Sequence, residues 1–307
     1  MSEAKGLFCS RRKKYSGSNS QESSILTLDQ PPRPGKRALL CCVSYKKQKS
    51  ELKGTEHDLK NMRDLLIKKF DFRPESILIL AEKRPYPYPT KENIEKAFQW
   101  LMMGIQPGDS LVFYFSGHGL RQLCTDGSEV DGFDEAICPV DFETHGTILD
   151  NDINETIVRP LIQGVTLHAI VDSCHSGTAL DLPYVYDIST GKWDDHRPPS
   201  GEPKGTSGGK AICISACEDY QLAADTSAFS ADKDSAGAMT SVFIKAVKTE
   251  EKITYREILN RMDESLKKVD NVGCFRGFIR RFFHRRILQD PILSASEEID
   301  LDADFKL

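Results

Sequence analysis

The chain has 307 residues, of which 39% are hydrophobic and 28% are charged, and its formal net charge is −5. These values are typical of a soluble globular protein with one large or two smaller domains, and the mildly acidic charge gives no reason to expect nucleic acid as a partner. No apolar stretch approaches the roughly 20 residues of a membrane span, and the N-terminus lacks an apolar leader.

The nine cysteines are scattered along the chain, and no two of them are spaced as a CxxC pair. Zinc ribbons that require such pairs are therefore excluded, and several reduced, buried thiols are expected instead. Reduced thiols are typical of a reducing compartment. We expect a cytoplasmic protein that is monomeric and uses no organic cofactor.

Residues 1–35 are predicted to form a disordered arm and linker, because they are polar and rich in Ser, Lys, Arg and Pro. The basic run at 11–14 fits either a nuclear signal or a solvated tail. The folded domain is expected to occupy residues 36–307.

Apolar runs alternate with amphipathic segments in this domain. Runs with the length of buried strands lie at 37–43, 76–80, 110–115, 167–172 and 211–216. Helices are indicated at about 59–70, 90–102, 157–161 and 254–266, the last starting with a capping box. Strands that alternate with helices and lack hairpin signals pair in parallel through right-handed crossovers. The sequence therefore predicts an α/β fold with a mostly parallel central sheet flanked by helices.

Two further segments stand apart by composition. Residues 189–210 are rich in Ser, Thr, Gly and Pro and are expected to form a long exposed loop, a natural place for proteolytic nicking. The Lys and Arg residues of this loop are Lys192, Arg197, Lys204 and Lys210. The Arg- and Phe-rich stretch 274–286 fits either a membrane-surface or partner-binding helix, or a basic surface element with its aromatic rings packed inward.

Two of the predicted strands run into reactive side chains, His118 and Cys174. The carboxyl ends of parallel strands share one edge of a sheet, where open α/β folds place their sites. A cysteine attacks as the thiolate and needs a base nearby, so we interpret Cys174 as a nucleophile and His118 as its base. Taken alone, either residue fits a structural role. His175 is closer in sequence but should point to the opposite side of the chain.

Small and acidic residues surround this pair. Gly119 follows His118 and lets the backbone approach a ligand, so the N–H groups of Gly119 and Cys174 are expected to bind an oxyanion. Asp172 lies two residues before Cys174, on the same face of the chain. Together with Asp58, at the start of the first helix, it would line a pocket for a cation. The alternative role of Asp58 is to compensate the helix dipole.

A second acidic feature lies between the two reactive strand ends. Its carboxylates are Asp126, Glu129, Asp131, Asp134, Glu135, Asp141, Asp150 and Asp152. Oxygen ligands at this density suit a hard cation such as Ca²⁺. Because no EF-hand spacing is present, a solvated acidic loop is the alternative interpretation.

Four motifs resemble those of the metacaspases: SGHG at 116–119, DGFDE at 131–135, PVDF at 139–142 and DSCHSG at 172–177. Segments 51–55 and 157–161 are similar, more narrowly, to the type I metacaspases of plants. The likeness covers about 36–187, 211–268 and 289–298.

This resemblance implies a caspase-like three-layer fold and a calcium-dependent cysteine endopeptidase that cleaves proteins after Arg or Lys. It implies that His118 and Cys174 form the catalytic dyad. The pocket for the basic side chain would consist of Asp58, Ser116 and Asp172. The activating Ca²⁺ would be held by Asp134, Asp150, Asn151 and Asp181. A link to programmed cell death or a stress response is implied in the same way. For a protease of this specificity, Lys192, Arg197, Lys204 and Lys210 in the loop 189–210 are candidate self-cleavage sites.

The sequence departs from the family pattern at two points. Asn151 stands where the family usually has a second Asp, which removes one charge from the calcium ligands. The zinc-finger prodomain common in plant type I members is not found, since the arm contains only Cys9. Asn151 and the basic stretch 274–286 leave a catalytically weak regulator or scaffold as an alternative. A third possibility is an acyl hydrolase or ligase that uses the same dyad.

Overall fold

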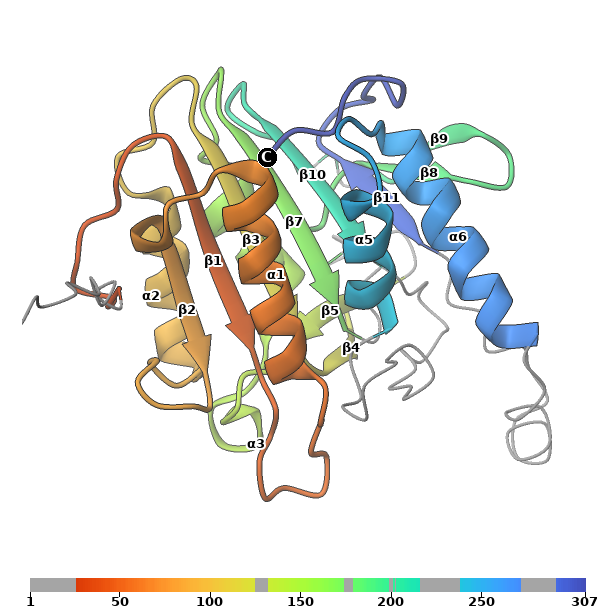
Figure 1. Ribbon diagram of the computed structural model, residues 1–307. Helices are drawn as coiled ribbons and strands as arrows, with labels where there is room; N and C mark the ends of the chain where they lie inside the picture. The colour runs from red at the N-terminus through yellow and green to blue at the C-terminus, as the bar shows by residue number, and fades with distance from the viewer. Residues whose placement is uncertain are drawn as a thin grey trace, which may run out of the picture.

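The computed structural model describes residues 26–124, 132–173, 179–198, 201, 203–215, 238–271 and 291–307. At its centre is an eight-stranded sheet in the order β2-β1-β3-β7-β10-β11-β8-β9 (Figure 1). These strands are β1 (Lys36–Cys42), β2 (Ile77–Ala81), β3 (Ser110–Ser116), β7 (Thr166–Asp172), β8 (Tyr184–Asp187), β9 (Lys192–Asp195), β10 (Lys210–Ser215) and β11 (Ile292–Ala295). The predicted α/β class is confirmed.

The sheet is parallel over β2, β1, β3, β7 and β10 and continues antiparallel through β11, β8 and β9. The five parallel strands match the five apolar runs predicted from the sequence. The antiparallel strands were not predicted. One of them, β9, lies inside 189–210, so the structure differs there from the single exposed loop that we expected.

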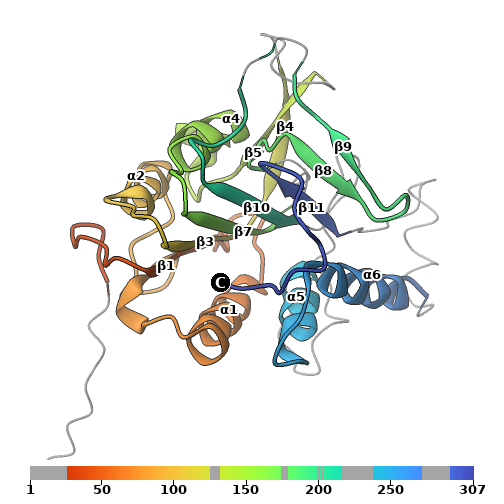
Figure 2. The ribbon, with the colours of Figure 1, turned by 90° about the horizontal axis from the view of Figure 1, so that it is seen from above.

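Helices cover both faces of the sheet, which gives three layers (Figure 2). On one face lie α1 (Thr55–Phe70), α5 (Ala238–Lys248) and α6 (Tyr255–Asn271). On the other lie α2 (Lys91–Met102), α4 (Asp150–Ile153) and a π-helical turn at Asn154–Val158, which replaces the helix predicted at 157–161. A short 3₁₀ turn (Pro74–Ser76) precedes β2. This arrangement confirms the expected caspase-like layering.

A second, smaller sheet extends the carboxyl edge of the main one. It is antiparallel and consists of β4 (Gly119–Leu123), β5 (Phe133–Ile137) and β6 (Ile148–Leu149), and the short helix α3 (Phe142–His145) lies between β5 and β6. The chain enters this sheet immediately after His118. Of the acidic stretch, Asp134 and Glu135 lie on β5, Asp141 at the start of α3, and Asp150 and Asp152 on α4, directly after β6.

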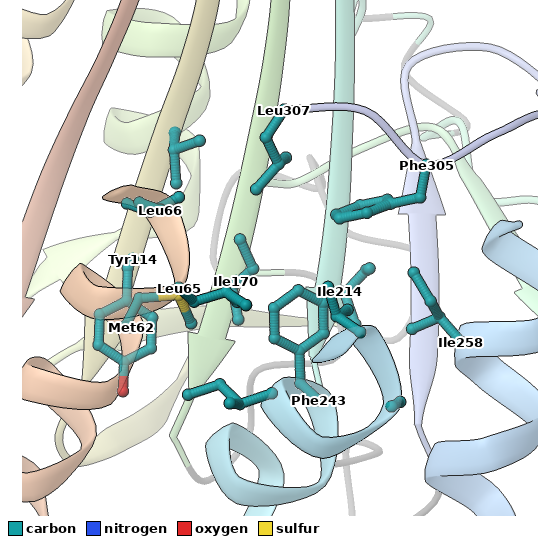
Figure 3. Packing of buried hydrophobic residues seen from close by; sticks show 14 of the residues in the cluster. Met62, Leu65, Leu66, Tyr114, Ile170, Ile214, Phe243, Ile258, Phe305 and Leu307 are labelled. Atoms are coloured by element: carbon teal, nitrogen blue, oxygen red, sulfur yellow. The ribbon is translucent and has the colours of Figure 1, made fainter. Parts of the chain in front are cut away.

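The alternation of strand side chains divides the core into two clusters. In β1, Leu40 and Cys42 face α1 and α5, whereas Leu39 and Cys41 face α2. Figure 3 shows the first cluster, in which sheet residues meet helix residues and the last residues of the chain. Its labelled members are Met62, Leu65, Leu66, Tyr114, Ile170, Ile214, Phe243, Ile258, Phe305 and Leu307. The tail of the chain is thus part of the core.

Within the described residues, five cysteines are free thiols and four of these are buried, in agreement with the sequence-based expectation. No helix in the described ranges is long and apolar enough to cross a membrane.

Candidate active site

The carboxyl ends of three neighbouring strands form the floor of the site. Cys42 of β1 pairs with Ser116 of β3, and Ser116 pairs with Asp172 of β7. The pairing continues one residue further, because the backbone N–H of Gly117 donates to the carbonyl of Asp172 over 3.2 Å. His118 therefore leaves β3 directly beside the end of β7.

His118 is half-buried, and its ring is oriented by a backbone carbonyl. The Nε2 atom lies 2.7 Å from the carbonyl oxygen of Ser50, in the segment between β1 and α1. A carbonyl can only accept a hydrogen bond, so Nε2 carries the proton in this contact. In the neutral ring, Nδ1 is then the atom with the lone pair. The imidazole is thereby set to act as a base through Nδ1.

The predicted nucleophile, Cys174, lies outside the described residues, which resume at Ala179. The described part of β7 ends with Asp172 and the buried Ser173. Gly119, the other predicted oxyanion residue, is buried as the first residue of β4 and pairs with Ile137. The assignments of the dyad and of the oxyanion amides remain predictions.

The three residues of the expected basic-side-chain pocket are buried on one face of the sheet. Asp58, in the first turn of α1, is fully buried, and Ser116 and Asp172 are nearly so. Burial raises the pKa of the Cys42 thiol, and the carboxylates of Asp58 and Asp172 add to this effect. Both carboxylates also raise the pKa of the Tyr114 phenol, after burial as its main cause. The carboxylates of Asp58 and Asp172 come from separate elements, and both are close enough to affect the same two buried side chains, Cys42 and Tyr114.

Thr240 orients one of these carboxylates. The Oδ2 atom of Asp172 accepts hydrogen bonds from the backbone N–H of Thr240 at 2.8 Å and from its hydroxyl at 2.6 Å. The Thr240 hydroxyl also lies 2.8 Å from the hydroxyl of Tyr114. Because the Thr240 hydrogen points at the carboxylate, Tyr114 is the donor in that second contact. Nothing in the sequence marks Thr240, which is distant in the chain and lies on α5.

The residues expected to bind Ca²⁺ lie on three segments: Asp134 on β5, Asp150 and Asn151 at the start of α4, and Asp181 shortly before β8. Asn151 Nδ2 donates to Asp134 Oδ1 over 3.2 Å. The two oxygens of Asp150 accept the backbone N–H groups of Asn151 and Glu135 at 2.9 and 3.1 Å. Within the described ranges, no three His, Cys, Asp or Glu side chains are gathered as a metal site would require.

Asp181, the fourth expected ligand, is buried against a cation that belongs to the protein. Its Oδ1 atom accepts a hydrogen bond from the Lys204 ammonium, and both side chains are almost fully buried. Asn154 Nδ2 lies within hydrogen-bonding distance of the carbonyls of Leu180, Asp181 and Lys204, at 2.9 to 3.2 Å. The oxygen donors are chemically suited to Ca²⁺, but one of them is engaged by Lys204 in this arrangement.

This burial separates Lys204 from the other candidate self-cleavage residues. Lys192, Arg197 and Lys210 are exposed, and Arg197 forms an ion pair with Asp195. Lys204, which we expected to be exposed, is only 4% exposed. A protease would have to draw its side chain out of the protein before it could bind.

Known proteins agree with the fold and with the motifs. The model of the metacaspase, peptidase C14 domain matches residues 36–183. Metacaspase-1 of Arabidopsis thaliana is 52% identical over 89% of this chain and 78% of its own length. Metacaspase-3 of the same plant is 44% identical over 87% of this chain and 74% of its own length. Metacaspase-1A of Neurospora crassa is 35% identical over 88% of this chain and 64% of its own length.

Among solved structures, a protein from Geobacter sulfurreducens superposes with a TM-score of 0.56 at 19% identity, over 88% of this chain and 97% of that one. This likeness supports the fold alone. The fold and the relatives together define a cysteine-type endopeptidase with a caspase-like α/β architecture. The chain belongs to the metacaspase family.

Proposed function

We propose that the peptide-bond chemistry is performed by Cys174 and His118. The Nδ1 atom of His118 takes the thiol proton, and the Cys174 sulfur attacks the carbonyl carbon of the scissile bond. The proton then passes from the imidazolium to the leaving amine, and water completes the hydrolysis of the thioester. The observation that supports this most is the bond between His118 Nε2 and the Ser50 carbonyl, because it leaves Nδ1 as the basic atom.

We propose that the negative charge on the tetrahedral intermediate is stabilised by the N–H groups of Gly119 and Cys174. Donors that are already in place contribute most to acyl transfer when they face the position where charge develops. Gly119 fits this role because it directly follows the histidine and is fixed as the first residue of β4.

The same site is proposed to select substrates with Arg or Lys before the cleaved bond. Asp58 and Asp172 supply two buried carboxylates, and Ser116 lies between the strand ends that carry Cys42 and Asp172. A basic substrate side chain would offset the cost of keeping these charges away from water. A peptide with an acidic residue at this position would add a third negative charge and should be rejected.

Calcium is proposed as the activating ion, with Asp134, Asp150, Asn151 and Asp181 as the residues that would hold it. When bound, it would supply positive charge that draws the acidic turns on either side of the site together. A calcium ion that binds through the Oδ1 atom of Asp181 would compete with Lys204 for that oxygen. Family likeness also supports a role in programmed cell death or stress, in the cytoplasm.

The test is the cleavage of matched peptides that carry Arg, Lys or Asp before the scissile bond, with and without millimolar Ca²⁺. We expect cleavage of the Arg and Lys peptides only, and more of it with Ca²⁺. The Cys174→Ala and His118→Ala proteins should lose at least about 10²-fold in kcat/KM. Undiminished cleavage of the Arg peptide by Cys174→Ala would overturn the assignment of the nucleophile.

A further inference from the structure

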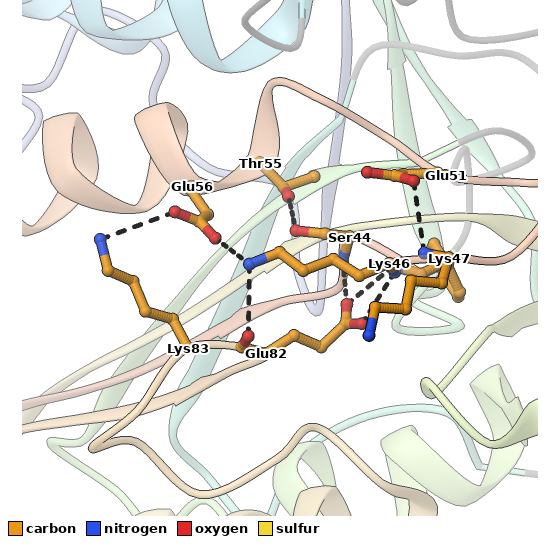
Figure 4. A network of polar contacts seen from close by, with 9 residues as sticks. Ser44, Lys46, Lys47, Glu51, Thr55, Glu56, Glu82 and Lys83 are labelled. Atoms are coloured by element: carbon orange, nitrogen blue, oxygen red, sulfur yellow. Dashed lines mark hydrogen bonds and ion pairs between the residues drawn. The ribbon is translucent and has the colours of Figure 1, made fainter.

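The segment between β1 and α1 is organised around one buried carboxylate. Glu82 directly follows β2, and its side chain reaches across to this segment (Figure 4). Its Oε2 atom accepts the backbone N–H groups of Ser44 at 2.5 Å and Tyr45 at 2.7 Å, and its Oε1 atom accepts that of Lys46 at 2.9 Å. Three successive N–H groups around one anion form a nest, a backbone site for negative charge. Here the anion is the protein's own glutamate.

Tyr45, in the middle of the nest, has an unusual backbone. Its φ angle is +52°, in the left-handed region that a bulky side chain rarely adopts. This conformation is sterically unfavourable for an L-residue with a side chain. Hydrogen bonds to a charged acceptor are stronger than those between neutral groups, so the three bonds to Glu82 hold this backbone in place. Backbone strain of this kind is kept where function requires a side chain in one place.

The strained backbone directs the Tyr45 side chain to His118. The fully buried Tyr45 ring lies 4.6 Å from the His118 ring, between centroids. Its hydroxyl accepts the backbone N–H of His118 at 2.9 Å and donates to the Cys138 carbonyl at 2.6 Å. The Cys138 N–H in turn donates to the His118 carbonyl over 3.0 Å. The phenol therefore closes a ring of hydrogen bonds around the main chain of the histidine.

Two neighbouring features depend on the same contact. A Cβ atom on Gly117 would lie 3.1 Å from the Tyr45 hydroxyl and 2.8 Å from the Phe115 ring, so the residue before His118 has to be a glycine. Burial raises the pKa of the Tyr45 phenol well above its ordinary value, which keeps the hydroxyl protonated as a donor. The segment also presents the Ser50 carbonyl, which accepts from the His118 ring.

We propose that Glu82 and Tyr45 are positioning residues for His118: the nest of Glu82 shapes the 44–50 segment, from which Tyr45 fixes the histidine's main chain and Ser50 fixes its ring. This inference rests on the proposed role of His118 as the base. Neither residue touches the reacting atoms in this scheme. They act by fixing the direction in which Nδ1 points.

The test compares Tyr45→Phe, Glu82→Gln and the matched control Glu51→Gln. Tyr45→Phe keeps the ring and removes the hydroxyl. Glu82→Gln replaces one acceptor oxygen with an NH₂ group that faces a backbone N–H. Glu51 also lies between β1 and α1, but its side chain is exposed. It accepts a hydrogen bond from the backbone N–H of Lys47 over 3.3 Å. The readouts are kcat, KM and the pH dependence of Cys174 alkylation by iodoacetamide.

We expect kcat to fall about tenfold or more for Tyr45→Phe and Glu82→Gln while KM stays within about twofold, because a misdirected base slows chemistry rather than binding. The alkylation profile should shift for both proteins and not for Glu51→Gln. A kcat within twofold of wild type for Tyr45→Phe, or an unchanged alkylation profile, would overturn the inference. If Glu82→Gln does not fold, Tyr45→Phe decides alone.

A His118→Ala protein, assayed alongside, separates this inference from the proposed function. Full activity of His118→Ala would mean that the proposed base is wrong. An inactive His118→Ala together with an unaffected Tyr45→Phe would remove only the positioning role.

Discussion

The carboxylate of Asp172 and the hydroxyl of Thr240 are 2.6 Å apart, although 68 residues separate them in the chain. Tyr114 donates to the same hydroxyl, so a chain of hydrogen bonds runs from Tyr114 through Thr240 to Asp172. We expect Thr240→Val to lower kcat/KM for the Arg peptide about tenfold, because it removes one bond to a charged group. Steady-state kinetics on the Arg and Lys peptides checks this.

Thr240→Ser is the matched control, since it keeps the hydroxyl and the backbone donor and loses only a methyl group. It should retain most of the wild-type kcat/KM. Equal losses for the Val and Ser proteins would mean that packing of the methyl group, and not orientation of Asp172, explains the effect.

The ion pair of Lys204 with Asp181 predicts a competition between an internal cation and Ca²⁺. Lys204→Met leaves a buried carboxylate without its counter-charge and should lower the free energy of unfolding by about 3–5 kcal/mol in the absence of calcium. If Ca²⁺ binds as proposed, Lys204→Met should also enlarge the rise in Tm on adding Ca²⁺, because Lys204 no longer competes for the Asp181 carboxylate. Thermal unfolding with and without Ca²⁺ measures both effects.

Two further proteins complete this test. Lys192→Met changes an exposed lysine of the same segment and should alter neither quantity. The double variant Lys204→Met with Asp181→Asn removes both charges, so it should recover stability without calcium and lose the calcium response. A calcium-induced rise in Tm that is equal in wild type and Lys204→Met would contradict the competition.

The parallel half of the fold could be predicted because its strands are continuous apolar runs that are buried on both faces. The antiparallel strands could not, because β8, β9 and β11 have only four residues each. Moreover, β11 pairs with β10 from about 80 residues away, and no local pattern carries that information. Sequence composition likewise made 189–210 look uniformly exposed, whereas Lys204 is buried by a partner 23 residues earlier.

The site shows the same division. The strand-end rule predicted that the strands leading to His118 and Cys174 end at one edge, and the structure pairs these strands, β3 and β7, in parallel, while Cys174 itself lies outside the described residues. The groups that orient these side chains had no such signal. The Ser50 contact uses a backbone carbonyl, which every residue has, and the left-handed Tyr45 depends on Glu82, which follows β2 and is 37 residues away in the chain. Positioning depends on tertiary contacts that a linear pattern does not encode.

A buried histidine predicts how stability changes with pH. Burial lowers the pKa of His168 on β7 from 6.5 to about 4. Between these pH values the unfolded chain binds a proton that the native state does not, so the free energy of unfolding falls as the pH falls. This loss should reach about 3 kcal/mol by pH 4. Urea unfolding of wild type and His168→Gln at pH 7 and pH 4.5 checks it.

His168→Gln removes the titrating group and should show a smaller acid-induced loss than wild type. His145→Gln, which changes an exposed histidine, is the control and should keep the full pH dependence. An identical pH dependence of the unfolding free energy in His168→Gln and wild type would show that groups other than His168 cause the loss of stability in acid.

The last residues of the chain are predicted to be essential for stability, because the Phe305 ring lies at the meeting point of four others. It contacts Tyr255 at 5.3 Å and His168 at 5.4 Å between ring centroids, and Phe70 and Phe243 at 5.8 and 6.0 Å. Phe305→Ala should lower the free energy of unfolding by about 3–5 kcal/mol, since it leaves a cavity among rigid rings.

Leu123→Ala is the control, because this side chain is 72% exposed, and it should lower the free energy of unfolding by less than about 0.5 kcal/mol. Phe305→Leu should lower the free energy of unfolding by less than Phe305→Ala, because the Leu side chain fills part of the cavity. Similar urea midpoints for the Ala and wild-type proteins would mean that this segment is not part of the cooperative core.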